Sequence, residues 1–275
     1  MIDPAITSAL TSALENSSKV ANTPLFSTVI DKLLGFKISE WNAQGETIKK
    51  QIIDGYEEAK QKGMGIQYVS AFRSNTNLIN TSIKASKYID PKKEKIIEAD
   101  NDIFWGLIEH SKLVSNNEMQ ELIAKILAGE YNSPGTYSMS ILERLKSLGK
   151  EELENFSNIL NAFIPKHGFI KEFFSMSKEA LETRVKMNID CEIFLEMQNL
   201  GLIQSGSYTK KFSVKKGVKY GINYGNESVA IEAILDMEEW IFPECYQLTT
   251  AGKQIAQHLN KNKSLDFIQW LKVFL

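Results

Sequence analysis

The sequence is poor in cysteine and has no long apolar run. Its 275 residues include only two cysteines, Cys191 and Cys245. Two cysteines in a chain of this size, with no secretory signal, fit a reducing cytoplasm better than a disulfide framework. The longest apolar stretch, PLFSTVIDKLLGF, is interrupted by an aspartate and a lysine and is shorter than the roughly 18 residues that a membrane-spanning helix requires. We therefore expect free thiols, a cytoplasmic location and no membrane span.

Residues typical of metal sites and catalytic motifs are also scarce. The three histidines, His110, His167 and His258, stand at no metal-ligand spacing from one another or from a cysteine. The sequence has no glycine-rich phosphate loop ending in Lys-Ser or Lys-Thr, no Gly-x-Ser-x-Gly elbow and no Gly-x-Gly-x-x-Gly after a predicted strand. We therefore expect a non-enzymatic protein with no catalytic residue, no metal and no cofactor.

Neither sign of charge dominates. Charged residues make up 24% and hydrophobic residues 43% of the chain, and the formal net charge is −2, which is an ordinary globular composition. A chain so nearly neutral has no overall attraction to nucleic acid or to an anionic membrane, so such binding would need a local patch. At this length the chain can bury a sizeable core in one large or two small domains.

The stretch 115–149 predicts a helical hairpin. Both halves carry apolar residues at helical spacing: Met119, Leu122, Ile123, Ile126 and Leu127, then Ile141, Leu142, Leu145 and Leu148. Between them, Ser133-Pro134-Gly135-Thr136 places proline where a turn fixes φ and glycine where a type II turn needs positive φ. Ser115 with Glu118, and Ser140 with Glu143, fit the capping-box pattern at the start of each helix.

Glu130 is the unusual residue of this hairpin. It falls at the C-terminal end of the first helix, where the macrodipole disfavours a carboxylate by roughly 0.3 to 1 kcal/mol. We expect a compensating partner, either Arg144 or turn amides near Tyr137 and Ser138. The alternative is a catalytic acid, although no second carboxylate or histidine has motif spacing to Glu130.

Up to Pro165 the sequence predicts helices only, which we interpret as a bundle over residues 1–165. Apolar spacing indicates helices near 3–20, 24–35 and 38–62. The first of these is either a docked N-terminal helix, which its lack of basic residues favours, or an interfacial membrane helix or self-association arm.

The helix expected from Tyr68 to Ile83 is rich in Asn and Thr. We expect its polar residues to form an exposed face, the alternative being a buried polar network; they are Arg73, Asn75, Asn77 and Asn80. Asp90-Pro91 then predicts an N-cap and a first-turn proline.

Residues 166–260 predict a small α+β module. A helix over 181–200 is followed by GLIQSGSYTKKFSVKKGVKYGINYGNESVAIEAI, in which β-branched and aromatic residues mix with turn-like glycines. YQLTTAGKQIAQHL then gives a strand edge and a helix. A helix, Leu-Gly-Leu-Ile, a ribbon and Leu-Thr-x-x-Gly before a helix is the layout of a winged helix-turn-helix unit, which other small α+β folds share.

Residues 261–275 predict a terminal helix capped by Ser264. The segment SLDFIQWLKVFL is apolar nearly all round, so the body of the protein or another subunit must cover it. The predicted fold is therefore mainly α: a multi-helix N-terminal bundle, a winged-helix-like α+β module and a C-terminal helix.

The predicted ribbon is rich in lysine. Between Glu196 and Glu227 there is no acidic residue, and the candidate nucleic-acid-binding residues fall in this window: Lys210, Lys211, Phe212, Lys215, Lys216 and Lys219. Five lysines among aromatics could follow a phosphate backbone and give steeply salt-dependent binding. The alternative is an exposed strand edge that lysines protect from unwanted pairing. The window has no arginine, which weakens base-specific readout.

The run from Ala99 to Phe156 resembles the signature block of a bacterial family, domain of unknown function 2806, which is related in pattern to the abortive-infection alpha (Abi-alpha) proteins. The residues that carry the structural signature are Glu118, Leu122, Ala128, Gly129, Glu130, Pro134, Gly135 and Arg144. Ile123 stands where the family pattern has tryptophan. The family has no agreed chemistry, and its Abi-alpha relatives imply a place in defence against phage by association only.

Three interpretations follow. The first is an interaction protein, a sensor or effector in anti-phage defence that works through self-association or a protein partner at its terminal helices. The second is a winged-helix DNA-binding regulator that uses the lysine ribbon. The third is an effector that inserts a terminal helix into a membrane.

Overall fold

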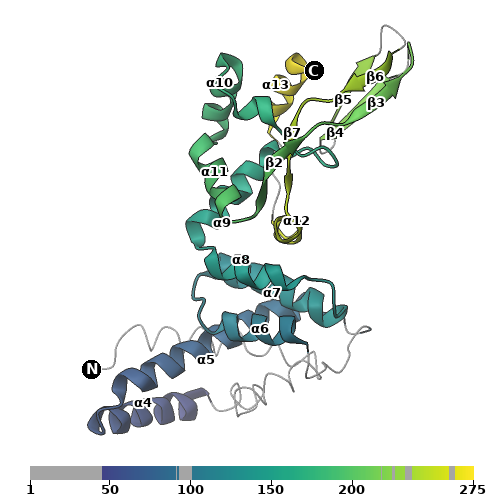
Figure 1. Ribbon diagram of the computed structural model, residues 1–275. Helices are drawn as coiled ribbons and strands as arrows, with labels where there is room; N and C mark the ends of the chain where they lie inside the picture. The colour runs from purple at the N-terminus through teal and green to yellow at the C-terminus, as the bar shows by residue number, and fades with distance from the viewer. Residues whose placement is uncertain are drawn as a thin grey trace. The chain divides into compact units, whose positions relative to one another are not determined.

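A computed structural model describes residues 45–90, 92, 101–217, 219–224, 227–232, 237–259 and 264–275. The helices expected near 3–20 and 24–35, and the proline of the Asp90-Pro91 start, lie outside the described residues. The described part is mainly α-helical, with a few small antiparallel sheets (Figure 1). None of its helices combines the length and apolar character needed to cross a membrane.

The chain divides into two compact units between Leu142 and Glu143, within helix α8. Helix α9 (Lys150–Ile159) packs against α11 (Cys191–Asn199), so its residues belong to the second unit. The domain boundaries expected after residues 165 and 260 stay predictions.

Helices build the first unit. They are α4 (Gly45–Gln61), α5 (Gly65–Ser86), α6 (Asp102–Ser111), α7 (Asn117–Asn132) and the start of α8 (Met139–Ser147). Helix α7 packs against both α5 and α6. Its predicted apolar stripe is buried, from Met119 to Leu127, so the core of this unit forms around α7.

The predicted caps of the hairpin need correction. Asn116, not Ser115, caps α7, because its Oδ1 accepts from the amides of Glu118 and Met119 at 3.0 and 2.9 Å. Ser115 instead accepts from the Arg73 guanidinium at 3.1 and 2.9 Å. The second capping box is also wrong, since α8 starts at Met139 and Ser140 already lies within its first turn.

The polar residues of α5 divide between solvent and core. Arg73 and Asn75 are exposed, as expected. Asn77 is only 5% exposed and donates to the Lys112 carbonyl at 3.0 Å and to Ser115 Oγ at 3.4 Å. The expectation of an exposed face is therefore wrong for Asn77, which joins α5 to the segment before α7.

Glu130 holds the corner of the hairpin together. Its carboxylate is buried and accepts from the Gly135 amide at 2.7 Å, the Asn101 side chain at 3.2 Å and the Tyr137 amide at 3.3 Å. Gly135 has φ 82°, so the type II turn is confirmed. The turn amides are thus the compensating partners, whereas Arg144 lies against Gly201 in the second unit.

Gly129 allows the corner to close. A Cβ at this position would overlap the hydroxyl group of Tyr137, whose ring is 5% exposed. Ala128 beside it is fully buried. The small residues at the end of α7 therefore let the chain that follows the turn pack directly on the helix.

A three-stranded antiparallel sheet organises the second unit. Its order is β1 (Phe169–Ile170), β7 (Cys245–Leu248), β2 (Ile203–Tyr208). Between α9 and β2 the unit also contains η3 (Leu160–Ala162), η4 (Lys171–Phe174), α10 (Lys178–Met187) and α11. Phe169 pairs with Tyr246 and Ile203 with Leu248. The central strand β7 thus joins segments that are far apart in the sequence.

Between β2 and β7 the chain forms two separate two-stranded sheets, which we together call the ribbon. Strand β3 (Lys211–Val214) pairs with β6 (Met237–Ile241), and β4 (Lys219–Tyr224) pairs with β5 (Glu227–Glu232), all antiparallel (Figure 1). The expected order of helix, ribbon and helix is therefore present in this unit.

The Leu-Thr-x-x-Gly motif fixes the start of α12 (Thr250–Ala256). Thr249 Oγ1 donates to the Gly201 carbonyl at 2.7 Å and accepts from the Gly252 amide at 3.0 Å. A Cβ at Gly252 would overlap the Leu202 carbonyl oxygen, so only glycine permits this approach.

The terminal helix α13 (Leu265–Phe274) is covered by its own unit. It packs against α10 and β5 and buries one face, which consists of Phe267, Ile268, Trp270 and Leu271. The predicted cap is confirmed, since Ser264 Oγ accepts from the Phe267 amide at 3.2 Å. Tyr224 Oη accepts from the Ser264 amide at 2.9 Å and donates to the Asn161 carbonyl, joining α13 to β4 and η3.

Glu130→Gln tests the role of the buried carboxylate. A glutamine cannot accept from all three donors, because one of its two terminal groups is itself a donor, so we expect the free energy of unfolding to fall by ~1 to 3 kcal/mol. Glu143→Gln, at an exposed position of α8, is the matched control and should change it by less than about 0.5 kcal/mol. Urea unfolding measures both, and equal midpoints would contradict a structural role for Glu130.

Candidate functional site

The predicted lysine residues lie on the ribbon. Lys211, Lys215, Lys216 and Lys219 are exposed. Lys210 is half-buried, donates to the Lys166 carbonyl and lies 5.6 Å from the Tyr208 ring centroid. Phe212 faces Trp240 across the ribbon, with ring centroids 5.8 Å apart. The structure thus brings the candidate residues onto one ribbon, although Lys210 and Phe212 are engaged at its base.

Acidic residues lie on the strands that pair with the lysine-bearing strands. In register, Glu232 of β5 stands opposite Lys219 of β4, and paired Cα atoms in an antiparallel ladder are about 4.5 to 5.5 Å apart. Strand β6, opposite β3, contains Glu238 and Glu239. Residues 210–244 hold five lysines and six acidic residues. The ribbon is therefore not a surface of one charge.

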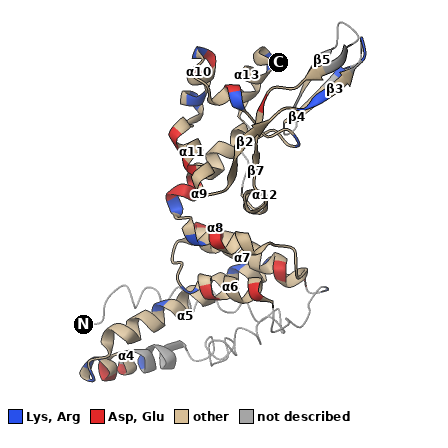
Figure 2. Cartoon of the chain, in the orientation of Figure 1, with Lys and Arg blue, Asp and Glu red and all other residues tan. Residues whose placement is uncertain are grey.

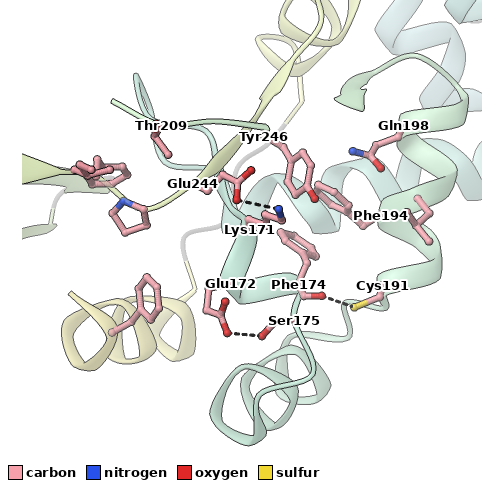
Figure 3. A pocket seen from close by; sticks show the side chains of 15 residues that line it. Lys171, Glu172, Phe174, Ser175, Cys191, Phe194, Gln198, Thr209, Glu244 and Tyr246 are labelled. Atoms are coloured by element: carbon pink, nitrogen blue, oxygen red, sulfur yellow. Dashed lines mark hydrogen bonds and ion pairs between the residues drawn. The ribbon is translucent and has the colours of Figure 1, made fainter. Parts of the chain in front are cut away.

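An aromatic groove lies at the base of the ribbon, and the sequence did not predict it. We define it by its lining residues, which come from η4, α11, the ribbon base, β7 and α13: Lys171, Glu172, Phe174, Ser175, Cys191, Phe194, Leu195, Gln198, Thr209, Ile241, Phe242, Pro243, Glu244, Tyr246 and Phe274. Its volume is about 760 Å³ (Figure 3). This volume falls within the range of ligand-binding pockets.

Stacked rings form the floor of the aromatic groove. The ring centroids of Phe174 and Phe194 are 3.9 Å apart at 30°, and Tyr246 lies 5.3 Å from Phe194. Helix α11 supplies Cys191, Phe194, Leu195 and Gln198 to the groove, a spacing that places them on one helix face. Asp190 fixes the start of that helix, because its side chain accepts from the Glu192 amide at 2.9 Å.

The rim of the aromatic groove exposes large apolar side chains. Leu195 is 57% exposed, Ile241 53% and Phe274 36%. Leu195 falls in the helix expected over 181–200, and the structure directs its side chain toward solvent. Apolar groups gathered in this way are typical of binding surfaces.

One ion pair lies inside the groove, beside the Tyr246 and Phe174 rings (Figure 3). Lys171 Nζ is 2.9 Å from Glu244 Oε2, and Ser207 donates to the other carboxylate oxygen. Hydrogen bonds from Ser207 and Lys171 lower the pKa of Glu244, and the hydrogen bond to Glu244 raises the pKa of Lys171. Both groups are therefore charged at neutral pH and neutralise each other.

The lining of the groove combines apolar side chains with a few polar ones. Its lining contains no histidine, and the Cys191 thiol donates to the Phe174 carbonyl at 3.4 Å. Over the described residues, no group of three or more His, Cys, Asp or Glu side chains is placed to hold a metal ion. The arrangement fits an apolar ligand that is oriented by a few polar groups.

Both cysteines are free thiols, as expected, but their environments differ. Burial raises the pKa of Cys245 to about 12, while Cys191 is half-buried in the aromatic groove. Because the thiolate is the reacting species, we expect a thiol reagent at mildly alkaline pH to modify Cys191 first and Cys245 only on unfolding. The reaction with the reagent should therefore have a fast phase that comes from Cys191. Cys191→Ser should remove this fast phase, and Cys245→Ser should leave it unchanged. A fast phase that survives Cys191→Ser would contradict this assignment.

Comparison with known proteins identifies a family. No curated protein and no solved structure matches the chain. A family model described as "Protein of unknown function (DUF2806)" matches residues 70–272, from α5 to α13. The match takes in the Glu130 corner, the ribbon and the aromatic groove except Phe274. Because it spans well over half of the sequence, the protein belongs to the DUF2806 family.

Proposed function

We propose that this protein is a non-enzymatic interaction protein whose second unit is a winged-helix-like module that binds a segment of a protein partner in the aromatic groove. The element order supports a winged-helix-like module: α9, β1, α10, α11, β2, the ribbon and β7, with β7 between β1 and β2. In this arrangement α11 takes the place of the recognition helix and the ribbon that of the wing.

The surface of α11 favours a protein partner over DNA. Recognition helices and wings approach polyanionic DNA with basic or neutral polar side chains. The exposed residues of α11 include Glu192, Leu195 and Glu196. The two carboxylates would repel phosphates, and DNA would bury the apolar Leu195 side chain poorly. The same helix forms one wall of the aromatic groove, and this groove is the observation that carries the proposal.

The dimensions and composition of the groove suit a peptide segment. Rigid aromatic side chains such as Phe174, Phe194 and Tyr246 supply much contact area with little loss of conformational entropy. The exposed Leu195 and Ile241 extend the apolar surface beyond the pocket itself. A segment of a partner could therefore bury anchor side chains in the pocket and cover this rim, as in other helix-in-groove or extended-peptide complexes.

The binding surface that we propose is the aromatic groove, to which the terminal helix α13 contributes only Phe274. That helix buries Phe267, Trp270 and Leu271 within its own unit, although Val273 is 84% exposed. Self-association or membrane insertion through α13 would first require this face to leave the core, at a large cost in buried apolar area. We propose a role in anti-phage defence only from the resemblance of the sequence pattern to that of Abi-alpha proteins, and a groove that captures a partner would fit a sensor or an effector.

A DNA-binding regulator is the second candidate. Exposed lysines on the ribbon favour it, notably Lys211, Lys215 and Lys216. The acidic residues of the paired strands oppose it, because they reduce the net positive potential that follows a phosphate backbone.

Selection from a random peptide display library tests the aromatic groove. We expect intact protein to enrich peptides with large apolar anchors, and Leu195→Asp to abolish their binding by placing a charge on the apolar rim. Leu181→Asp is the matched control, because Leu181 is 42% exposed on α10 and does not line the groove. Enriched peptides that bind Leu195→Asp as well as intact protein would overturn the proposal.

Binding of labelled duplex DNA at several salt concentrations separates the two candidates. We expect no salt-sensitive binding by intact protein, because the ribbon carries both signs of charge. The comparison variant changes Lys211, Lys215 and Lys216 to Glu. Binding that weakens with salt and disappears in this variant would promote the DNA-binding regulator, since each phosphate contact adds to the salt dependence.

A further inference from the structure

Acidic side chains border the aromatic groove on its η4 and α11 side. Glu172 lines the groove, and Glu192 and Glu196 are exposed on α11 (Figure 2). At 100° per residue, helix geometry places Glu192 about 60° round the axis from the rim residue Leu195 and Glu196 about 100° from it, so Glu192 is the nearer of the two to the groove. Lys171, the basic residue of the lining, is neutralised by Glu244. The potential on this side of the groove is therefore negative.

Local structure explains Glu192 but not Glu196. Glu192 lies in the first turn of α11, where the helix dipole favours a carboxylate. Glu196 lies in the C-terminal half, where the dipole disfavours one, and it follows Glu192 at the i,i+4 spacing that brings like charges together. Within the described residues neither carboxylate takes part in an ion pair. The pair therefore destabilises the free helix, and a bound cation would relieve the repulsion.

The opposite side of the groove has a different charge. Lys211 stands opposite Ile241 in the β3 and β6 register, and Lys210 donates to the Lys166 carbonyl. Carboxylates thus flank the groove beside its η4 and α11 lining, and lysines flank it beside its lining at the ribbon base. An occupant with positive charge along the α11 wall complements this asymmetry.

We infer that the occupant of the aromatic groove is a basic amphipathic segment of a partner protein, with apolar anchors on the Phe174, Phe194 and Tyr246 rings and Lys or Arg residues beside Glu192 and Glu196. The inference rests on the proposed function and adds the charge of the partner. Arginine suits this wall in particular, because its guanidinium group pairs with carboxylates in a bidentate manner and stacks on aromatic rings.

The test compares two double charge reversals on one labelled peptide from the display selection. Glu192→Lys/Glu196→Lys should weaken binding by ~10-fold or more at low salt, and this difference should shrink as salt screens the charges. Glu179→Lys/Glu182→Lys on α10, also exposed and outside the groove lining, should leave the affinity unchanged. Circular dichroism and urea midpoints equal to those of intact protein establish that each variant is folded.

The outcomes separate the inference from the proposed function. Groove-dependent peptides that are neutral or acidic, or that bind the Glu192→Lys/Glu196→Lys variant equally well, would overturn the inference and leave the proposed function in place. Failure to select any groove-dependent peptide would overturn both. Self-association of intact protein that the same variant abolishes in analytical ultracentrifugation would assign the groove to a second copy of this chain and also overturn the inference.

Discussion

The pairing of β7 with both β1 and β2 is the constraint on which the second unit depends. It places Tyr246 opposite Phe169 and so brings η4, which follows β1, beside α11, which precedes β2. The aromatic groove exists only because these segments meet. The motif at Thr249 and Gly252 secures the same strand from its other end, through the Gly201 and Leu202 carbonyls.

Local patterns predicted several helices and turns, because their causes are local, but the single helix expected over 181–200 is in fact two helices, α10 and α11, divided at Asn188, which has φ 52°. The apolar stripe of α7, the positive φ of Gly135 and the cap at Ser264 all follow from a few neighbouring residues. The cap of α7 was predicted wrongly for the opposite reason. Ser115 and Asn116 both fit an N-cap, and Arg73, 42 positions earlier, accounts for the choice by engaging the Ser115 hydroxyl.

The candidate site depends even more on contacts between residues that are far apart in the sequence, which local patterns do not predict. The lysines of the ribbon stand out in a short window of sequence, whereas acidic residues of the opposite strands come later in the chain. The groove takes its walls from five stretches near 171–175, 191–198, 209, 241–246 and 274. The adjacent Phe173 and Phe174 are one hint in the sequence, but they fit a core equally well. The charge and the apolar character of the groove become apparent only when the fold brings these stretches together.

The separation of β1 and β7 along the chain also determines when the groove can form during synthesis. Phe169 meets Tyr246 only after the whole intervening segment has left the ribosome, and closing such a long loop is slow compared with forming helices such as α10 and α11. Until then the Tyr246 ring of β7 is missing from the groove beside the Phe174 and Phe194 rings. A nascent or truncated chain therefore displays these aromatic side chains without a formed groove, and chaperones that bind exposed apolar side chains would cover them until β7 pairs.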